Sequence, residues 1–361
     1  MRTLNTLLVL GLLMVLIVPG VLAVNIGAGV DVDVTTEDFA PRVWLCGERV
    51  VYDDATEPGR VSEDGQELIE RINNYAFEGE QVKWLVLVMD KNKIDQNIDV
   101  YGTVGDSQGE GNDIEVNCLR VGYQSEFEEC NARLEEEHLE WNSELMDFFE
   151  CTLTVETPES MYGEFWVTVE AQDGDGLMGT MDENEYWFFN PVIALSIDGE
   201  LTFEDVRPGT DAYSSTLLVG NDADDGSGVM LDMFISGTDF YDSSSSGARC
   251  PDTNQLSLTN FAYFATNGAY SSLQDPRGDN DSDILNDAEG YTGIGYGIGF
   301  NDPNPFYGDY EILQAQPVGP YFVANVLAPG AEMAVTFRLN LPEPCNGDFD
   351  TGSIYFWGEA I

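Results

Sequence analysis

Short runs of alternating hydrophobic and polar residues, separated by turn residues, fill much of the first half of the chain. Alternation with a period of two predicts β-strands that bury one face. Strands of this length with turns between them are typical of a β-sandwich, so we predict an all-β fold class with a first sandwich domain over 39–190. The predicted strands are Arg42–Tyr52, Gln81–Met89, Ile98–Val104, Ile114–Val121, Cys151–Glu156, Glu164–Ala171 and Glu185–Phe189.

One stretch of this half has a different period. From Asn131 to Phe149, large side chains recur at spacings of three and four, which is the period of a helix. We therefore predict a helical insertion over about 131–149 and a shorter helix over Glu63–Asn73. The side chains of the longer helical stripe are Leu134, His138, Trp141, Leu145 and Phe148.

The second half of the chain, after Pro191, shows a pattern that occurs twice. Val206–Gly209 and Leu327–Gly330 each contain Pro-Gly and are each followed by an alternating run. Pro-Gly suits the centre of a type II turn, because Pro fixes φ and Gly supplies a positive φ. We predict a second β-sandwich over 191–361, of a jelly-roll-like or related type. Its Ser-, Gly-, Asp- and Asn-rich middle, Tyr241–Asn304, is predicted to be a loop held by ligands or by a disulfide.

The N-terminus has the pattern of a secretory signal peptide over residues 1–23. A short apolar run follows Arg2, and Val21-Leu22-Ala23 offers a cleavage site, so we expect a secreted protein. The alternative is an uncleaved membrane anchor. The segment 24–38 would then be an N-terminal strand and linker, because Val and Asp alternate in Val24–Thr35. This strand either begins its own domain or is available to another molecule.

The charge of the chain is extreme. It carries 66 acidic residues against 14 Lys and Arg, for a net charge of −52. Such a surface repels nucleic acid and anionic lipid, so neither is an expected partner. Its self-repulsion must be screened by salt or by divalent cations. A high-salt (halophilic) habitat and bound Ca²⁺ are both open explanations.

Six cysteines behind a signal peptide predict disulfides. The domain boundary at Pro191 leaves Cys250 and Cys345 together, so these two are expected to pair. In the first domain we prefer Cys46–Cys118 with Cys130–Cys151, although the sequence does not exclude the other pairings. Cys46, Trp84 and Cys118 on early, middle and later strands also have the order of an immunoglobulin-like core. A zinc site is not expected, since there is no Cys-x-x-Cys pair.

One acidic loop is a candidate Ca²⁺ site. Carboxylates at positions 1, 3, 5 and 9 of the loop match the way Ca²⁺ collects oxygen ligands, although Ile284 replaces the turn glycine of an EF-hand. A solvated acidic loop is the alternative. The candidate ligands are Asp279, Asp281, Asp283, Asp287 and Glu289. Asn280 begins an Asn-x-Ser sequon and is a candidate glycosylation site. Shorter Asp-Gly runs at 172–177 and 222–226 are metal sites or, more simply, hairpin turns.

The sequence contains no motif of an enzyme. Its single histidine, His138, lies on the predicted helix, and there is no Gly-x-Ser-x-Gly for a Ser-His-Asp hydrolase. A carboxylate-dependent glycosidase stays an alternative, because sequence does not give the separation of acid pairs. Aromatic residues crowd among glycines and acids in 291–321. They are typical either of core packing or of a carbohydrate-binding face.

Residues Ile197–Asp242 resemble the TasA/camelysin family of secreted β-sandwich fibre subunits. The similarity lies in Leu201–Val206, the Pro-Gly turn after it, the strand into Val219–Asn221 and a further strand to about Gly237. It implies a TasA-like sandwich for the second domain, as the alternative to a jelly-roll-like one, and extracellular fibres in which Val24–Thr35 is donated to the neighbouring subunit. The peptidase activity credited to camelysin-type members is not expected, since His-Glu-x-x-His is absent. The whole second half is also similar to acidic two-domain proteins secreted by archaea.

Together, these patterns predict a secreted cell-surface or extracellular-matrix protein with a structural or adhesive role. It would associate with itself or with other surface proteins, and polymerise through its N-terminal strand. A Ca²⁺-dependent carbohydrate-binding module, with glycans as partners, is the alternative that we keep open beside the glycosidase.

Overall fold

The computed structural model describes residues 33–52, 73–94, 97–108, 114–125, 127, 130, 140–181, 184–244, 247–251, 253–275, 289–297, 311–318 and 321–361. The predicted signal peptide and the predicted shorter helix, except for Asn73, lie outside them. The chain divides into two compact units, Met1–Asp38 and Phe39–Ile361. In the first unit, residues 33–38 have no regular secondary structure and Val34 is 74% exposed.

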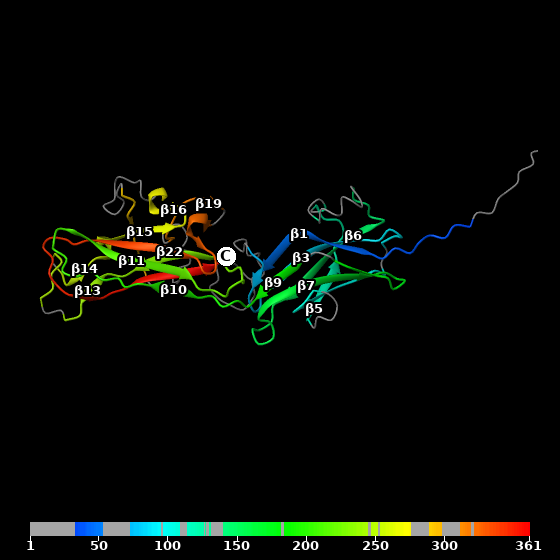
Figure 1. The fold of residues 1–361 in the computed structure, drawn as a ribbon, viewed down its shortest axis with the longest axis horizontal. Helices are drawn as coiled ribbons and strands as arrows, with labels where there is room; N and C mark the ends of the chain where they lie inside the picture. Colours follow the sequence, from blue (N-terminus) through cyan, green and yellow to red (C-terminus); the bar gives the residue numbers. More distant parts are fainter. Residues whose placement is uncertain are drawn as a thin grey trace, which may run out of the picture. The chain divides into compact units, whose positions relative to one another are not determined.

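The second unit consists of β-strands, and the described residues contain no α-helix, which confirms the all-β class (Figure 1). Strands β1 to β9 pair with one another, and β10 to β24 pair with one another. The first set is β1 (Arg42–Tyr52), β2 (Tyr75–Ala76), β3 (Gln81–Met89), β4 (Asp99–Gly105), β5 (Ile114–Arg120), β6 (Met146–Thr154), β7 (Gly163–Gln172), β8 (Met178–Thr180) and β9 (Glu185–Phe189).

The second set contains shorter strands as well as long ones. It is β10 (Leu195–Asp198), β11 (Asp211–Asn221), β12 (Leu231–Gly237), β13 (Phe240–Asp242), β14 (Gln255–Leu256), β15 (Phe261–Asn267), β16 (Tyr270–Ser271), β17 (Thr292–Gly293), β18 (Gly295–Tyr296), β19 (Pro317–Val318), β20 (Tyr321–Phe322), β21 (Val326–Leu327), β22 (Glu332–Asn340), β23 (Phe349–Thr351) and β24 (Ile354–Ala360). Because Phe39–Ile361 forms one compact unit, the domain boundary at Pro191 stays a prediction.

The first set folds into a sandwich. Its strand order is β1-β3-β6-β5-β4-β7-β9-β2, with β8 beside β7. Strand β5 pairs with β4 through its first residues and with β6 through its last, so it joins two halves of the sheet. The halves face each other across one core, where the Trp84 ring on β3 meets the Trp187 ring on β9 edge-on at 5.7 Å.

The outer face of β1, β3 and β6 is buried as well. Leu85, Leu87 and Met89 alternate with the core residues of β3 and pack beneath Trp141. The Trp141 ring stacks on the Phe148 ring at 5.2 Å. The predicted helix over 131–149 is therefore wrong from residue 140 onwards: residues 140–145 form turns, and residues 146–149 begin β6. Residues 131–139, with His138, lie outside the described part.

Three disulfides form, and two of them differ from the preferred pairing. Cys250–Cys345 is as predicted, but the first half contains Cys46–Cys130 and Cys118–Cys151. Cys118 and Cys151 are directly opposite on paired strands. Cys46 packs on the outer face of the sheet, whereas Cys151 packs in the central core. The predicted Cys46–Cys118 bridge of an immunoglobulin-like core is therefore wrong.

The second set forms a further sandwich, as predicted. One sheet has the order β10-β11-β22-β15-β16, and in the other β24 pairs with β12. Their inner faces share a core to which β11, β12, β15 and β22 contribute Val219, Met233, Tyr263 and Phe337. The prediction of a loop over Tyr241–Asn304 is wrong in part, since β15 lies within it as an inner strand paired with β22. Its run Phe261–Ala265 is apolar enough to be buried on both faces.

Both predicted Pro-Gly turns are present, with Gly209 at φ 74° and Gly330 at φ 75°. Each turn precedes one of two long strands, β11 and β22, that pair antiparallel. The Gly209 N–H donates to the carbonyl of Leu341, just after β22, and the Gly330 N–H donates to the carbonyl of Asn221, at the end of β11. Each turn therefore binds the end of the opposite strand. Among the described residues, no helix is long and apolar enough to cross a membrane.

Candidate functional site

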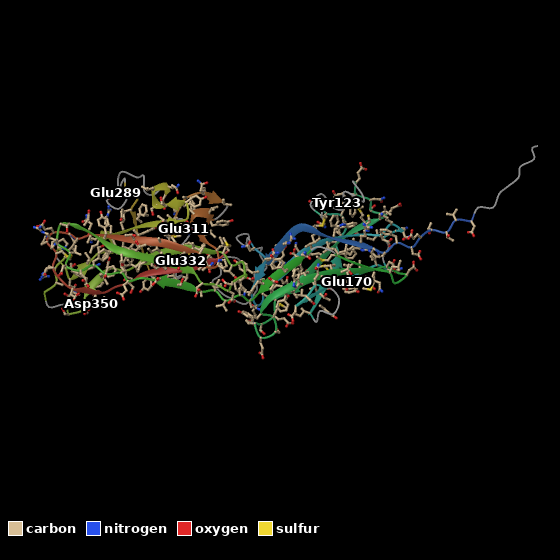
Figure 2. The ribbon with its side chains drawn as sticks, in the orientation of Figure 1. Tyr123, Glu170, Glu289, Glu311, Glu332 and Asp350 are labelled. Atoms are coloured by element: carbon tan, nitrogen blue, oxygen red, sulfur yellow. A yellow bond between two sulfur atoms is a disulfide. The ribbon has the colours of Figure 1, made fainter. Side chains whose placement is uncertain are left out.

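The predicted Ca²⁺ loop lies almost entirely outside the described residues. Asp279, Asp281, Asp283 and Asp287, together with the sequon at Asn280, are in the part that is not described. Glu289 is described and is exposed on the surface of the second set (Figure 2). Within the described ranges, no three or more His, Cys, Asp or Glu side chains come together as a metal site. Calcium binding and glycosylation at this loop stay predictions.

The two shorter Asp-Gly runs form turns. The Asp173 Oδ1 atom accepts hydrogen bonds from the N–H groups of Asp175 and Leu177, at 2.9 and 2.8 Å, and so closes the hairpin between β7 and β8. The Asp224 Oδ2 atom accepts from the Tyr162 hydroxyl and from the Val192 N–H, both at 2.9 Å. The first run is therefore the predicted hairpin turn, whereas the second is a turn between β11 and β12, which lie in different sheets.

The aromatic segment at 291–321 is described only in part. The Tyr291 ring packs against those of Tyr213 and Phe264, both at 5.8 Å, and the Arg338 guanidinium lies over it at 4.6 Å. This cluster covers the outer face of β11, β22 and β15 and is explained by packing. Tyr296 is 64% exposed. Phe300, Phe306, Tyr307 and Tyr310 lie outside the described residues.

A groove of about 690 Å³ lies at one end of the second sandwich. One wall is the segment Leu201–Val206, which is the start of the TasA-like motif and forms no strand here. Cys345 and Phe349 also line the groove, so the Cys250–Cys345 disulfide lies beside it. Segments far apart in the sequence thus build one concave surface.

The floor of the groove is aromatic. The Phe261 ring, on β15, packs against the Phe240 ring at 4.7 Å and against the Phe203 ring at 5.9 Å. Carboxylates of Glu204, Asp205 and Asp348 are among the groove's lining groups. Among the described residues that line the groove there is no histidine, lysine or free cysteine. An apolar floor beside carboxylates is suited to binding an apolar ligand that carries positive charge.

A second surface feature is the edge strand β10. Within the described part of the chain it pairs with β11 alone, so its outer backbone edge is open. Ile193, Leu195 and Ile197 are every second residue along this stretch, so they project from the same face of it, and they are 44%, 37% and 54% exposed. An open edge with large apolar side chains is a site at which another strand can add. The sequence pattern gave no sign of it, because Ile197 and its neighbours resemble any half-buried strand.

Comparisons with known proteins identify no relative from which function can be taken. No protein-family model and no curated protein matches the chain. Among solved structures, it is similar to the C-terminal domain of the AgI/II polypeptide BspA of Streptococcus agalactiae, with 10% identity, a TM-score of 0.30, and coverage of 89% of this chain and 97% of that one. It is also similar to a putative secreted protein from Eubacterium rectale, with 8% identity, a TM-score of 0.21, and coverage of 78% and 66%. TM-scores of this size do not support an inference about function.

Proposed function

We propose that the chain is a secreted structural or adhesive protein of the cell surface or extracellular matrix, and that its copies polymerise by strand addition. The open apolar edge of β10 is the observation that carries this proposal. Val24–Thr35 of one copy would add to β10 of the next. The three disulfides support an extracellular location, since such bonds persist in oxidising compartments.

The pattern of the donated segment fits this edge. Val30, Val32 and Val34 alternate with Asp31 and Asp33, so an added strand would present valines on one face and carboxylates on the other. The valines would cover the exposed side chains along β10, and the carboxylates would remain in solvent. Main-chain hydrogen bonds to the open edge would supply affinity.

The charge of the chain sets the conditions for assembly. Two copies that each carry a net charge of −52 repel one another. The screening length is roughly 10 Å at 0.1 M salt and roughly 3 Å at 1 M. We therefore expect polymers at molar salt and their dissociation on dilution into low salt.

Electron microscopy at about 1 M salt, where the screening length is short, tests the proposal. We expect filaments from the mature chain, and none after deletion of residues 24–35 or after Ile197→Asp, which places a charge on the β10 edge. Val318→Asp, at a position that is 48% exposed on β19, is the matched control and should leave filaments intact. Filaments that persist in both edge variants would show that another surface drives assembly.

A second candidate function, a binding module, is favoured by the groove. Its volume of about 690 Å³ is in the range of small-molecule sites. Two binding assays distinguish the possible ligands. A glycan array tests for the carbohydrate that the sequence predicts, and a panel of apolar cations tests for the ligand that suits the groove lining. Phe203→Asp would abolish either kind of binding if the groove is the site.

A further inference from the structure

A carboxyl group is buried in the second sandwich and takes no part in the β10 edge or in the groove. Asp232 lies on β12, whose residues are all buried, and its side chain has 0% exposure. Leu231, Met233 and Ile235 face the core, so Asp232 projects from the opposite face of the strand. This face is covered by Glu311, whose backbone bridges to Phe234, and by Asn325.

One oxygen of Asp232 is satisfied and the other is not. Its Oδ1 atom accepts a hydrogen bond of 2.7 Å from the Asn325 amide. The same amide also donates to the Met233 carbonyl, and its oxygen accepts from the Leu313 N–H, so Asn325 is fully engaged. The Asp232 Oδ2 atom is buried without a hydrogen-bond partner. A buried ionised oxygen in this position is costly.

Among the described residues, the charged groups placed on this side of β12 are acidic. Glu311, also 0% exposed, is bridged to Phe234, the next residue of β12 on the same face as Asp232, and Glu359 is opposite Asp232 on β24. Of the other described groups on this side, Val326 of β21 and the amides of Asn325 and Gln314 are uncharged, and the Gln314 side-chain amide is 3.5 Å from Glu311 Oε2. The backbone N–H of Gln314 donates to the buried carboxylate of Asp275. Burial first, and then repulsion by Glu311, raise the pKa of Asp232 to about 8. Figure 2 places Glu311 among the strands of the second set.

We propose that Asp232 and Glu311 hold one proton between them and that this shared proton makes the stability of the second sandwich depend on pH. A proton on Asp232 Oδ2 converts that oxygen from an acceptor into a donor, and a Glu311 carboxylate oxygen is the acceptor. A divalent cation would need six to eight oxygens, and the described residues bring only two buried carboxylates together here.

The direction of the pH dependence follows from the sign of the shift. The pKa of Asp232 is raised in the folded chain, so the folded state holds the proton over a range in which the unfolded state has lost it. The contribution of Asp232 to stability is therefore fully present below the ordinary pKa of Asp and is lost as pH rises through the folded pKa. Few other side chains titrate in the pH range in which Asp232 loses its proton, since the chain has one histidine and no free cysteine among its described residues.

Thermal unfolding of the full chain between pH 6 and pH 9 tests the proposal. We expect the melting temperature of the second sandwich to fall by about 5–10 °C. This is the shift expected in a domain of this size when the stability contributed by one bound proton declines over about two pH units. Asp232→Asn should flatten this dependence and raise stability at pH 8, because its amide is a permanent donor in place of the proton. Glu311→Gln is the second variant and should flatten it too. Asp198→Asn, which removes one exposed carboxylate from β10, should leave the slope unchanged.

Infrared spectroscopy at pH 7 gives a direct reading. The band of a protonated carboxyl should be present in the natural chain and absent from Asp232→Asn. The proposal is wrong if the natural chain and Asp232→Asn share one pH slope, or if that band is missing. It is also overturned if Ca²⁺ raises the melting temperature at pH 9 only when Asp232 is present, since the pair would then be a cation site.

Discussion

Removing the Cys250–Cys345 disulfide should destabilise the chain more than removing Cys118–Cys151. The first closes a loop with a sequence separation of 95 residues and the second one of 33. A cross-link acts mainly by restricting the unfolded chain, and the chain-entropy relation gives roughly 4.7 kcal/mol for the longer loop and roughly 3.7 kcal/mol for the shorter one at 25 °C. The expected difference is thus about 1 kcal/mol.

The assay compares two double variants, Cys250→Ala/Cys345→Ala and Cys118→Ala/Cys151→Ala. Cys250, Cys345 and Cys151 are buried and Cys118 is half-buried, so each variant removes a largely buried disulfide. Urea unfolding followed by far-ultraviolet circular dichroism gives the free energy of unfolding for each. An equal loss in both, or a larger loss for Cys118–Cys151, would refute the entropic reasoning and indicate that the ladder between β5 and β6 depends on its cross-link.

Two further predictions concern local hydrogen bonds. Asp173→Ala removes the acceptor of two backbone N–H groups in the β7–β8 hairpin, and chemical unfolding should show a loss of about 1–2 kcal/mol; no loss would mean that water replaces the carboxylate. Hydrogen bonds from Ser243 lower the pKa of Asp350, so their contribution is present above the ordinary pKa of Asp and is lost as pH falls through the folded pKa. Ser243→Ala should therefore raise the pKa of Asp350, measured by NMR titration, and an unchanged pKa would contradict this.

The sequence predicts β1, β3 and β9 with the boundaries that the structure shows, although both faces of β1 and β3 are buried. It fails at the start of β6. Met146 and Phe148 pack outward while Phe149 and Cys151 pack inward, so the alternation near residue 149 is lost and the apolar spacing imitates a helix. The same alternation of inward and outward residues determines which cysteines can pair, because it directs the Cys46 side chain away from the central core.

The groove and the carboxyl pair depend on contacts between distant segments. Leu201 and Phe349 line one groove although nearly the whole second half separates them. Asp232 did carry a signal, as one acid within the apolar run Val229–Ile235. With 66 acids in the chain, this signal is recognisable only once burial is known.

The pairing of β11 with β22 affects the time at which the chain can fold. Asp211 is opposite Asn340, so the central strands of this sheet come from the two ends of the second half. Contacts between such distant residues form slowly, because the intervening chain must first be closed into a loop. During synthesis, the sheet has to wait until residue 340 has emerged. If the chain is exported through a translocation channel, this delay would keep its second half unfolded during transit, and the sheet would close only on the far side of the membrane.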